Sequence, residues 1–240
     1  FWTMGETGPC GPCSEIHLMP DPEVSMEDAL AGGGPDKDER WVEVWNLVFM
    51  QFERKVKGGE LLPLARKGVD TGMGLERLAA LKNGFQSTYD TDLVKPIILE
   101  VAKLAGVDYG QGGEADVSLR VIADHARATA FCVADGVFPE KGRREYVLRR
   151  IMRRAIRHGK LLGFEEPFFD KACLAVVDLM GEDYPELMER RELIGKIVAA
   201  EETSFRRTLD RGLSKLESAI AQTQKDGQSA LAEEFVGDLY

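Results

Sequence analysis

The sequence contains no run of apolar residues long enough to cross a membrane. A transmembrane helix needs ~20 consecutive apolar residues, and no stretch of this 240-residue chain approaches that length. The opening residues, Phe1-Trp2-Thr3-Met4-Gly5, have neither an initiator methionine nor the basic and then apolar layout of a signal peptide. We therefore expect a cytoplasmic location, no membrane partner, and a chain cut from a longer one.

Cysteine is scarce, at four residues, which argues against a disulfide framework in a chain of this length. Cys10-Gly-Pro-Cys13 has a metal-binding spacing, and His17 follows four residues later. A structural zinc site uses four ligands, and the sequence offers no second cysteine pair to complete these three. We expect reduced thiols and no zinc site in this chain.

Basic residues are outnumbered by acidic ones, 31 to 41, which gives a net charge of −10. That balance argues against a general nucleic-acid coat, although a total can hide a local patch. Apolar residues make up 44% of the chain, so the acidic excess does not indicate a disordered tail. The length allows one large domain or two small ones, and no repeat of fixed period is present.

Residues 41–54 give the strongest strand pattern. Aromatic and β-branched residues dominate, and neither Gly nor Pro interrupts them. Both faces are mainly apolar, so we expect a central and buried strand. Asn46 and Glu43 interrupt these faces, and a buried polar group needs a partner. Either they bond to neighbouring backbone or they line a ligand pocket in the sheet.

The periodicity of the chain changes near residue 86. Before it, residues 1–13 are rich in turns, residues 14–19 suit a short strand, and residues 20–40 suit a loop with a helical turn at 26–30. After it, apolar residues recur at helical spacing. We expect helices over residues 91–105, 115–134, 144–162, 167–180, 186 to about 225, and 229–240. The fold class is therefore α+β, with a mixed first part, residues 1–86, and an all-helical second part, residues 87–240.

One expected helix is strongly basic although the chain is acidic. Between Lys141 and Lys160 there are nine basic residues and one acid, which leaves −18 on the rest of the chain. At ~100° per residue, five arginines share about 140° of the helix surface and apolar residues occupy the other side. These five are Arg149, Arg150, Arg153, Arg154 and Arg157.

Two interpretations of the basic helix compete. Its arginines could form a solvated face that pairs with acids elsewhere in the chain. Alternatively they bind phosphate, because the planar guanidinium fork can donate two hydrogen bonds to one anion. Neighbouring arginines repel each other unless an anion lies between them, which favours a nucleic-acid backbone. Structured RNA, bound through its shape and phosphates, suits such a surface.

A second signal lies at Val69-Asp70-Thr71-Gly72-Met73-Gly74-Leu75-Glu76-Arg77. Gly72 and Gly74 allow backbone to approach a ligand closely where a strand passes into a helix. Arg77, in the first turns of that helix, can reach a phosphate or stack on a base, and Asp70 adds a carboxylate. The segment lacks the Gly-Lys-Ser/Thr ending of a P-loop, so it indicates an anionic ligand of another kind.

Several blocks of the sequence resemble those of the alanyl-tRNA synthetase family, a branch of the class II aminoacyl-tRNA synthetases. Residues 69–77 resemble motif 3 of that class in its alanine-specific wording. The resemblance covers essentially the whole chain, with the blocks in one order. The other blocks are residues 1–16, 44–52, 118–125 and 146–151, and residues 201–203 continue the helical region.

The resemblance implies a fold and an activity. Residues 1–86 would form the C-terminal half of the antiparallel sheet domain of a class II catalytic domain, with motif 3. Residues 87–240 would form most of an all-helical tRNA-recognition domain, incomplete at its C-terminus. The implied ligase activates alanine with ATP and Mg²⁺ and transfers it to the 3′ end of its tRNA. The partners implied are alanine, ATP and the acceptor stem of alanine tRNA.

The resemblance also implies roles for particular residues. Asp70 would bind the α-ammonium of alanine, and Trp2, Asn46, Val48 and Gly72 would line the pocket for its methyl group. Arg77 and Gly74 would contact ATP, and Glu43 would serve ATP through Mg²⁺. The basic residues that would contact tRNA are Lys141, Arg143, Arg144, Arg149, Arg150, Arg153, Arg154 and Arg157.

The chain departs from the family pattern in three ways. Motifs 1 and 2 would precede residue 1, and the editing domain, with its expected zinc, is not in this chain. We therefore expect an internal fragment that is inactive alone. Many relatives read a G·U pair with an Asn near position 141, but no Asn lies between Pro139 and Tyr146. The acidic partner of that Asn would follow Tyr240. The alternative function is a stand-alone RNA-binding helical module with a degenerate nucleotide pocket.

Overall fold

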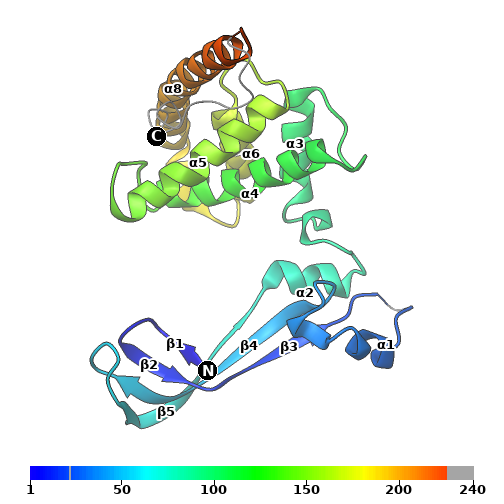
Figure 1. The fold of residues 1–240 in the computed structure, drawn as a ribbon, viewed down its shortest axis with the longest axis vertical. Coiled ribbons are helices and arrows are strands. Elements are labelled where there is room, and N and C mark those ends of the chain that lie inside the picture. The colour runs from blue at the N-terminus through cyan, green and yellow to red at the C-terminus, as the bar shows by residue number, and fades with distance from the viewer. Residues whose placement is uncertain (22, 226–240) are drawn as a thin grey trace. The chain divides into compact units, whose positions relative to one another are not determined.

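A computed structural model describes residues 1–21 and 23–225 of the chain. The chain divides into two compact units, Phe1–Leu93 and Val94–Tyr240. An antiparallel sheet dominates the first unit, and the described part of the second is helical (Figure 1). The predicted α+β class is therefore confirmed. Among the described residues, no helix is long and apolar enough to cross a membrane.

The first unit is built around strand β4 (Val42–Arg54). Strands β2 (Gly8–Gly11) and β3 (Cys13–Leu18) pair with successive stretches of one edge of β4, while β5 (Leu61–Met73) pairs along its other edge. All pairings are antiparallel. Strand β1 (Trp2–Thr3) lies outside β2. The short helices are α1 (Met26–Ala31), η1 (Gly34–Asp36), α2 (Leu75–Lys82) and η2 (Thr88–Asp90).

The prediction that residues 41–54 form a central strand is confirmed, but the prediction that this strand is buried is wrong. Within β4 only Val48 is buried, and Trp45 on the other face is 36% exposed. The reason is that the sheet of this unit has almost no second layer. Its buried apolar residues are Cys10, Ala29, Val48 and Ala80.

Strands β1 and β2 were not predicted, because their segment is rich in Gly and Pro. Both residue types are poor formers of strand interiors, but they are tolerated near sheet edges and at irregular pairings. Gly11 shows why glycine is needed here. A Cβ atom on it would lie 1.8 Å from the backbone oxygen of Phe49. The close approach of β2 to β4 therefore excludes every side chain at this position.

The second unit contains six described helices, close to those predicted. They are α3 (Lys95–Ala105), α4 (Glu114–Ala134), α5 (Arg143–Leu161), α6 (Phe169–Met180), α7 (Pro185–Glu189) and α8 (Arg191–Lys225). The pattern from residue 186 onwards is interrupted at Arg190, which gives α7 and α8 in place of one helix. The helix expected at residues 229–240 lies outside the described residues.

Helix α4 packs against α3, α5 and α6, while α6 also packs against α8 (Figure 1). The buried side chains on α4 follow the helical spacing of one face: Leu119, Ile122, Ala126, Ala130 and Val133. Near the start of α4, the Asp116 carboxylate accepts backbone N–H bonds from Gly110 and Gly112 at 2.9 and 2.7 Å. These bonds lower the pKa of Asp116 and fold the glycine-rich connector onto the helix.

Candidate functional site

The junction between β5 and α2 holds Arg77 against β4. Gly74 is the N-cap of α2, and Arg77 lies in its first turn. The Arg77 Nη1 atom donates a hydrogen bond to the backbone oxygen of Glu43 at 2.8 Å and lies 3.5 Å from the carboxylate of the same residue. The guanidinium is therefore anchored at one point of the sheet while half of the side chain stays exposed.

Register brings four of the predicted pocket residues onto one patch of the sheet. Asn46 lies opposite Gly72, and Val48 lies opposite Asp70. Residues directly opposite in an antiparallel pair project from the same face of the sheet, and so do residues two apart on one strand. A Cβ atom at Gly72 would meet no atom within 4 Å, so the space above it is open. On this face Val48 is buried and Asp70 is exposed.

A bulge turns Glu43 onto the face of Asn46. Strict alternation along β4 puts residues 43 and 46 on opposite faces. The register shifts, however, so that Ile16 lies opposite Trp45 but His17 lies opposite Glu43. The extra residue of β4 reverses the alternation beyond it. Glu43, and Arg77 with it, thus belongs to the same face as Asn46.

Two residues of this face had no role predicted from the sequence. Asn46 Nδ2 donates to Glu15 Oε1 at 3.0 Å, and His17 Nε2 lies 3.6 Å from Glu15 Oε2. Both residues lie on β3. The sequence predicted a strand there, but nothing in it indicated which residue of residues 41–54 each would face.

The carbonyl of Asn46 is also held, from the β5 side. The Thr71 hydroxyl donates to the Asn46 backbone oxygen at 3.0 Å and accepts the indole N–H of Trp45. Strand β5 therefore supplies both the open space at Gly72 and a side chain that fixes the backbone across from it.

The structure does not bring Trp2 to this patch. Trp2 pairs with Gly11 on β2, so its strand lies two strand spacings, ~10 Å, from β4. Register and contacts within Phe1–Leu93 bring together Glu43, Asn46, Val48, Asp70, Gly72, Gly74 and Arg77. The role of Trp2 in the pocket stays a prediction.

The Cys10, Cys13 and His17 group is spread along β4. Cys10 lies opposite Phe52, whereas His17 lies opposite Glu43. Seven residues of extended chain separate Cys10 from His17, which is ~23 Å at about 3.3 Å per residue. All four cysteines are free thiols. In residues 1–21 and 23–225, no three His, Cys, Asp or Glu side chains are grouped so as to hold a metal ion.

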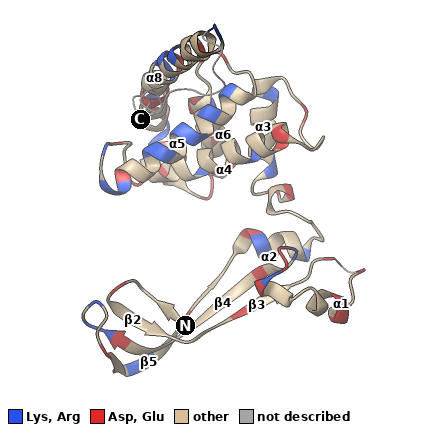
Figure 2. Cartoon of the chain, in the orientation of Figure 1, with Lys and Arg blue, Asp and Glu red and all other residues tan. Residues whose placement is uncertain are grey.

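The basic helix is α5, and it carries its charge as a band of blue along the ribbon in Figure 2. Leu148, Met152, Ala155 and Ile156 are buried on its inner face. The predicted amphipathic arrangement is therefore present: an apolar stripe faces the core and basic residues occupy the rest of the surface.

Two of the five arginines point to an acid on α8. The Nε atoms of Arg149 and Arg153 both donate to Glu201 Oε1 at 2.9 Å. Their side chains are only 18% and 29% exposed, and Glu201 is 10% exposed. The Arg153 guanidinium also lies 4.8 Å from the centre of the Phe205 ring. Arg149 and Arg153 therefore follow the first interpretation of the basic helix, in which arginines pair with an acid elsewhere in the chain.

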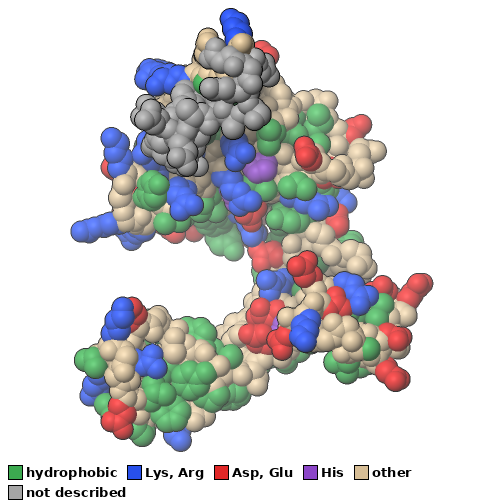
Figure 3. Space-filling model, in the orientation of Figure 1, with side chains coloured by type: hydrophobic (Ala, Val, Ile, Leu, Met, Phe, Trp, Pro, Cys, Tyr) green, Lys and Arg blue, Asp and Glu red, His purple; other side chains and the backbone are tan. Residues whose placement is uncertain are grey.

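The other three arginines, Arg150, Arg154 and Arg157, are exposed. None of them forms an ion pair with an acidic side chain of a described residue. Arg154 lies 3.5 Å from His125 Nε2, and it is near enough to Asp124 to help lower the pKa of that carboxyl. Figure 3 shows lysine and arginine side chains gathered around a histidine on this side of the unit. Burial, with Arg154 and Arg157 nearby, lowers the pKa of His158, which bonds to Ser118 Oγ at 3.0 Å.

The other predicted basic residues lie at the start of α5: Arg143 and Arg144 are in its first turn, and Lys141 directly precedes its N-cap, Gly142. Lys141, Arg143 and Arg144 are exposed, and Arg144 Nε bonds to Glu145 at 3.1 Å. Arg143 has a φ of 56°, a left-handed conformation that is uncommon outside glycine. The chain thus enters α5 through a strained turn that projects cationic side chains away from the core.

Comparison with known proteins shows the family to which both the sheet residues and the basic helix belong. A family model described as "tRNA synthetases class II (A)" matches residues 1–240. Curated relatives named alanine–tRNA ligase include one from Sorangium cellulosum (strain So ce56), 51% identical over 100% of this chain and 26% of the relative. Another, from Anaeromyxobacter dehalogenans (strain 2CP-C), is 54% identical over 94% of this chain and 25% of the relative. The chain spans about a quarter of the length of the curated relatives it matches.

Proposed function

Because the chain belongs to the class II tRNA synthetase (A) family, we propose that it is an internal part of an alanine–tRNA ligase. Residues 1–86 contribute part of the catalytic domain, and residues 87–240 contribute a tRNA-recognition domain. The observation that carries the proposal is the register of β4 and β5. It puts Asn46 across from Gly72 and Val48 across from Asp70, next to the anchored Arg77.

In the proposed reaction, the alanine carboxylate attacks the α-phosphate of ATP and pyrophosphate leaves. The exposed Asp70 carboxylate binds the alanine ammonium, a charge-assisted hydrogen bond. Gly72 leaves room for a small ligand, and the buried Val48 supplies apolar surface for a methyl group. Such a pocket discriminates poorly against substrates that differ by one small group, so we expect editing outside this chain.

Arg77 and Glu43 are proposed to serve ATP. Both contacts of Arg77 with Glu43, to its backbone oxygen and to its carboxylate, are made by Nη1, which leaves Nε and Nη2 available for phosphate oxygens. The Glu43 carboxylate, 38% exposed, suits a Mg²⁺ ion held mainly by substrate phosphates, which needs only one or two protein carboxylates. The ion would neutralise charge that develops on the phosphates.

Helix α5 is proposed to bind the acceptor stem of alanine tRNA. Its exposed arginines, Arg150, Arg154 and Arg157, lie within one stripe of the helix, and none of them forms an ion pair with a described acidic residue, although Asp124 is near Arg154. Such a stripe suits phosphates spaced along an RNA strand. Lys141, Arg143 and Arg144 extend it at the start of the helix.

Alanine-dependent ATP–pyrophosphate exchange tests the catalytic proposal in the full-length ligase. Asp70→Ala should lower kcat/KM for alanine at least about tenfold, because it removes a charge-assisted hydrogen bond to the substrate. Asp36→Ala, an exposed aspartate in the same unit, is the matched control and should leave the exchange unchanged. Undiminished exchange in Asp70→Ala would remove the ammonium role of Asp70. Absence of exchange in the unaltered ligase, with RNA binding retained, would favour an RNA-binding module.

A further inference from the structure

Glu15 occupies an unassigned position beside the proposed alanine pocket. It lies directly opposite Asn46 across β3 and β4, while Gly72 lies opposite Asn46 on the other side. Asn46 thus has the Glu15 carboxylate beside it on β3, and on β5 it has Gly72, which carries no side chain. The hydrogen bond from Asn46 Nδ2 to Glu15 Oε1 is 3.0 Å long.

That hydrogen bond determines which way the Asn46 amide is turned. An ionised carboxylate can only accept hydrogen bonds, so the amide must direct its N–H group, and not its oxygen, at Glu15. The Oδ1 atom is left facing away from β3. No described residue donates a hydrogen bond to it in the structure. Asn46 therefore offers one acceptor to a ligand above Gly72.

The neighbours of Glu15 and Asn46 reinforce this orientation. His17 lies 3.6 Å from the second oxygen of Glu15, which restrains the carboxylate along β3. Thr71 donates to the backbone oxygen of Asn46 from β5. Asn46 is thus held by its side chain from one strand and by its carbonyl from the other, which limits the positions that Oδ1 can take.

We propose that Glu15 is a positioning residue for the substrate's ammonium group, acting through Asn46. With the amide turned by Glu15, the Asn46 Oδ1 and the Asp70 carboxylate form two acceptors on one face, with open space at Gly72 between their strand positions. A small α-amino acid presents one ammonium with three donors, which suits two such acceptors. The inference rests on the proposed function and adds to it the reason why the pocket favours an ammonium.

The test separates the charge of Glu15 from its hydrogen bond, using exchange kinetics of the full-length ligase. Glu15→Asp keeps the charge but withdraws the carboxylate by one methylene, so the bond to Asn46 is broken. KM for alanine should rise about five- to tenfold, the size of one orienting hydrogen bond, with KM for ATP unaffected. The conservative variant Glu15→Gln keeps an acceptor oxygen in place and should stay within about twofold. Ser14→Ala, on the same strand, is the control.

A double-mutant cycle shows whether Glu15 acts through Asn46. In an Asn46→Ala background, Glu15→Asp should cause no further rise in KM for alanine, because the orienting bond has already been removed. Full additivity, an unchanged KM in Glu15→Asp, or equal losses in Glu15→Asp and Glu15→Gln would each overturn the positioning role. These outcomes leave the proposed function intact. Loss of alanine-dependent exchange in the unaltered ligase would overturn both.

Discussion

Gly11 shows how one missing side chain determines local structure. The residue is buried, and a Cβ atom would lie 1.8 Å from the Phe49 oxygen and 2.9 Å from its carbonyl carbon. Both are backbone atoms of the central strand, so neither can turn aside as the end of a flexible side chain could. A side chain at position 11 would therefore push β2 away from β4.

We expect Gly11→Ala to lower the free energy of unfolding by about 1–3 kcal/mol, the usual cost of overpacking. All three tryptophans, Trp2, Trp41 and Trp45, lie in the sheet unit. Urea unfolding followed by tryptophan fluorescence therefore measures the change. Gly68→Ala is the control, because a Cβ atom there meets nothing within 4 Å. Equal stability of the two variants would contradict the close-approach argument.

At the residue scale, the sequence identified the type of several site residues but not their faces. Asn46 was predictable as a polar group inside an apolar strand pattern. Glu43 was predictable in kind, but the bulge near Ile16 turns it onto the face of Asn46. No role was predicted for Glu15, because its proposed role depends on Asn46, which lies opposite it on the neighbouring strand. Register is a property of two strands, and periodicity within one strand does not contain it.

At the scale of elements, helix α8 decides which arginines of α5 remain available. Glu201 accepts hydrogen bonds from Arg149 and Arg153, and the exposed residues are Arg150, Arg154 and Arg157. The sequence predicted the amphipathic helix because apolar spacing is local. It could not divide the arginines, because Glu201 lies 48 and 52 positions away in the chain.

We expect the two groups of arginines to behave differently in RNA binding. Arg150→Gln with Arg157→Gln should weaken binding of alanine tRNA and reduce the slope of log K against log salt by about 1 for each phosphate that is no longer neutralised. Arg149→Gln with Arg153→Gln should leave the slope unchanged and lower the stability of the helical unit. Affinities measured at several salt concentrations, beside thermal unfolding, distinguish these outcomes. A reduced slope in the second pair would assign those arginines to RNA as well.

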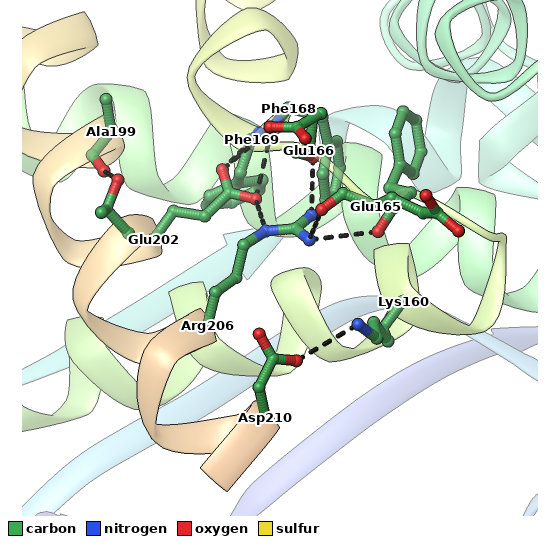
Figure 4. A network of polar contacts seen from close by, with 11 residues as sticks. Lys160, Glu165, Glu166, Phe168, Phe169, Ala199, Glu202, Arg206 and Asp210 are labelled. Atoms are coloured by element: carbon green, nitrogen blue, oxygen red, sulfur yellow. Dashed lines mark hydrogen bonds and ion pairs between the residues drawn. The ribbon is translucent and has the colours of Figure 1, made fainter. Parts of the chain in front are cut away.

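A buried ion pair on α8 binds the start of α6 and the loop that follows α5. Glu202, fully buried, accepts the backbone N–H groups of Phe168 and Phe169 and the Nε of Arg206 (Figure 4). Arg206 also donates to the backbone oxygens of residues 164–166. The carboxylate therefore caps the start of α6, while the guanidinium satisfies the loop after α5.

Glu202→Ala should destabilise the helical unit by about 3–5 kcal/mol, because it leaves the Arg206 charge buried without its partner. The far-ultraviolet circular dichroism signal during urea unfolding measures this loss. Glu192→Ala is the matched control on the same helix. Its side chain is 89% exposed, and among the described residues its ion pair is with Lys196, so its removal should change stability by less than about 0.5 kcal/mol. Comparable losses in both variants would refute the role of the buried pair.

Across the whole molecule, buried apolar residues are distributed unevenly. Among the described residues, the buried apolar side chains of the sheet unit are those of Cys10, Ala29, Val48 and Ala80, whereas the remaining buried apolar side chains all follow Leu93. Apolar side chains are visible on the surface of the sheet unit (Figure 3), and Val69 and Met73 of β5 are 55% and 42% exposed. A domain's stability comes largely from such burial, so the two units should differ in stability.

We expect residues 94–240 expressed alone to keep their helical circular dichroism signal and to unfold in one cooperative thermal transition. Residues 1–93 alone should show no cooperative transition, because their sheet lacks a second layer. A sharp transition from residues 1–93, with dispersed amide signals in nuclear magnetic resonance spectra, would contradict this. The domain boundary near residue 86 proposed from the sequence can be tested in the same experiment by comparing pieces that begin at residues 87 and 94.

The sequence by itself determined the α+β class, the central strand, the basic amphipathic helix and the family blocks. Each depends on residues close together in the chain, whose spacing expresses local geometry directly. Only the tertiary structure decided that Glu43 and Glu15 lie on the same face as Asn46, and that Glu201 accepts hydrogen bonds from two of the five arginines. These facts depend on a bulge, a strand register and a contact between distant helices. They are set by packing between segments, where a shift of one residue changes every partner.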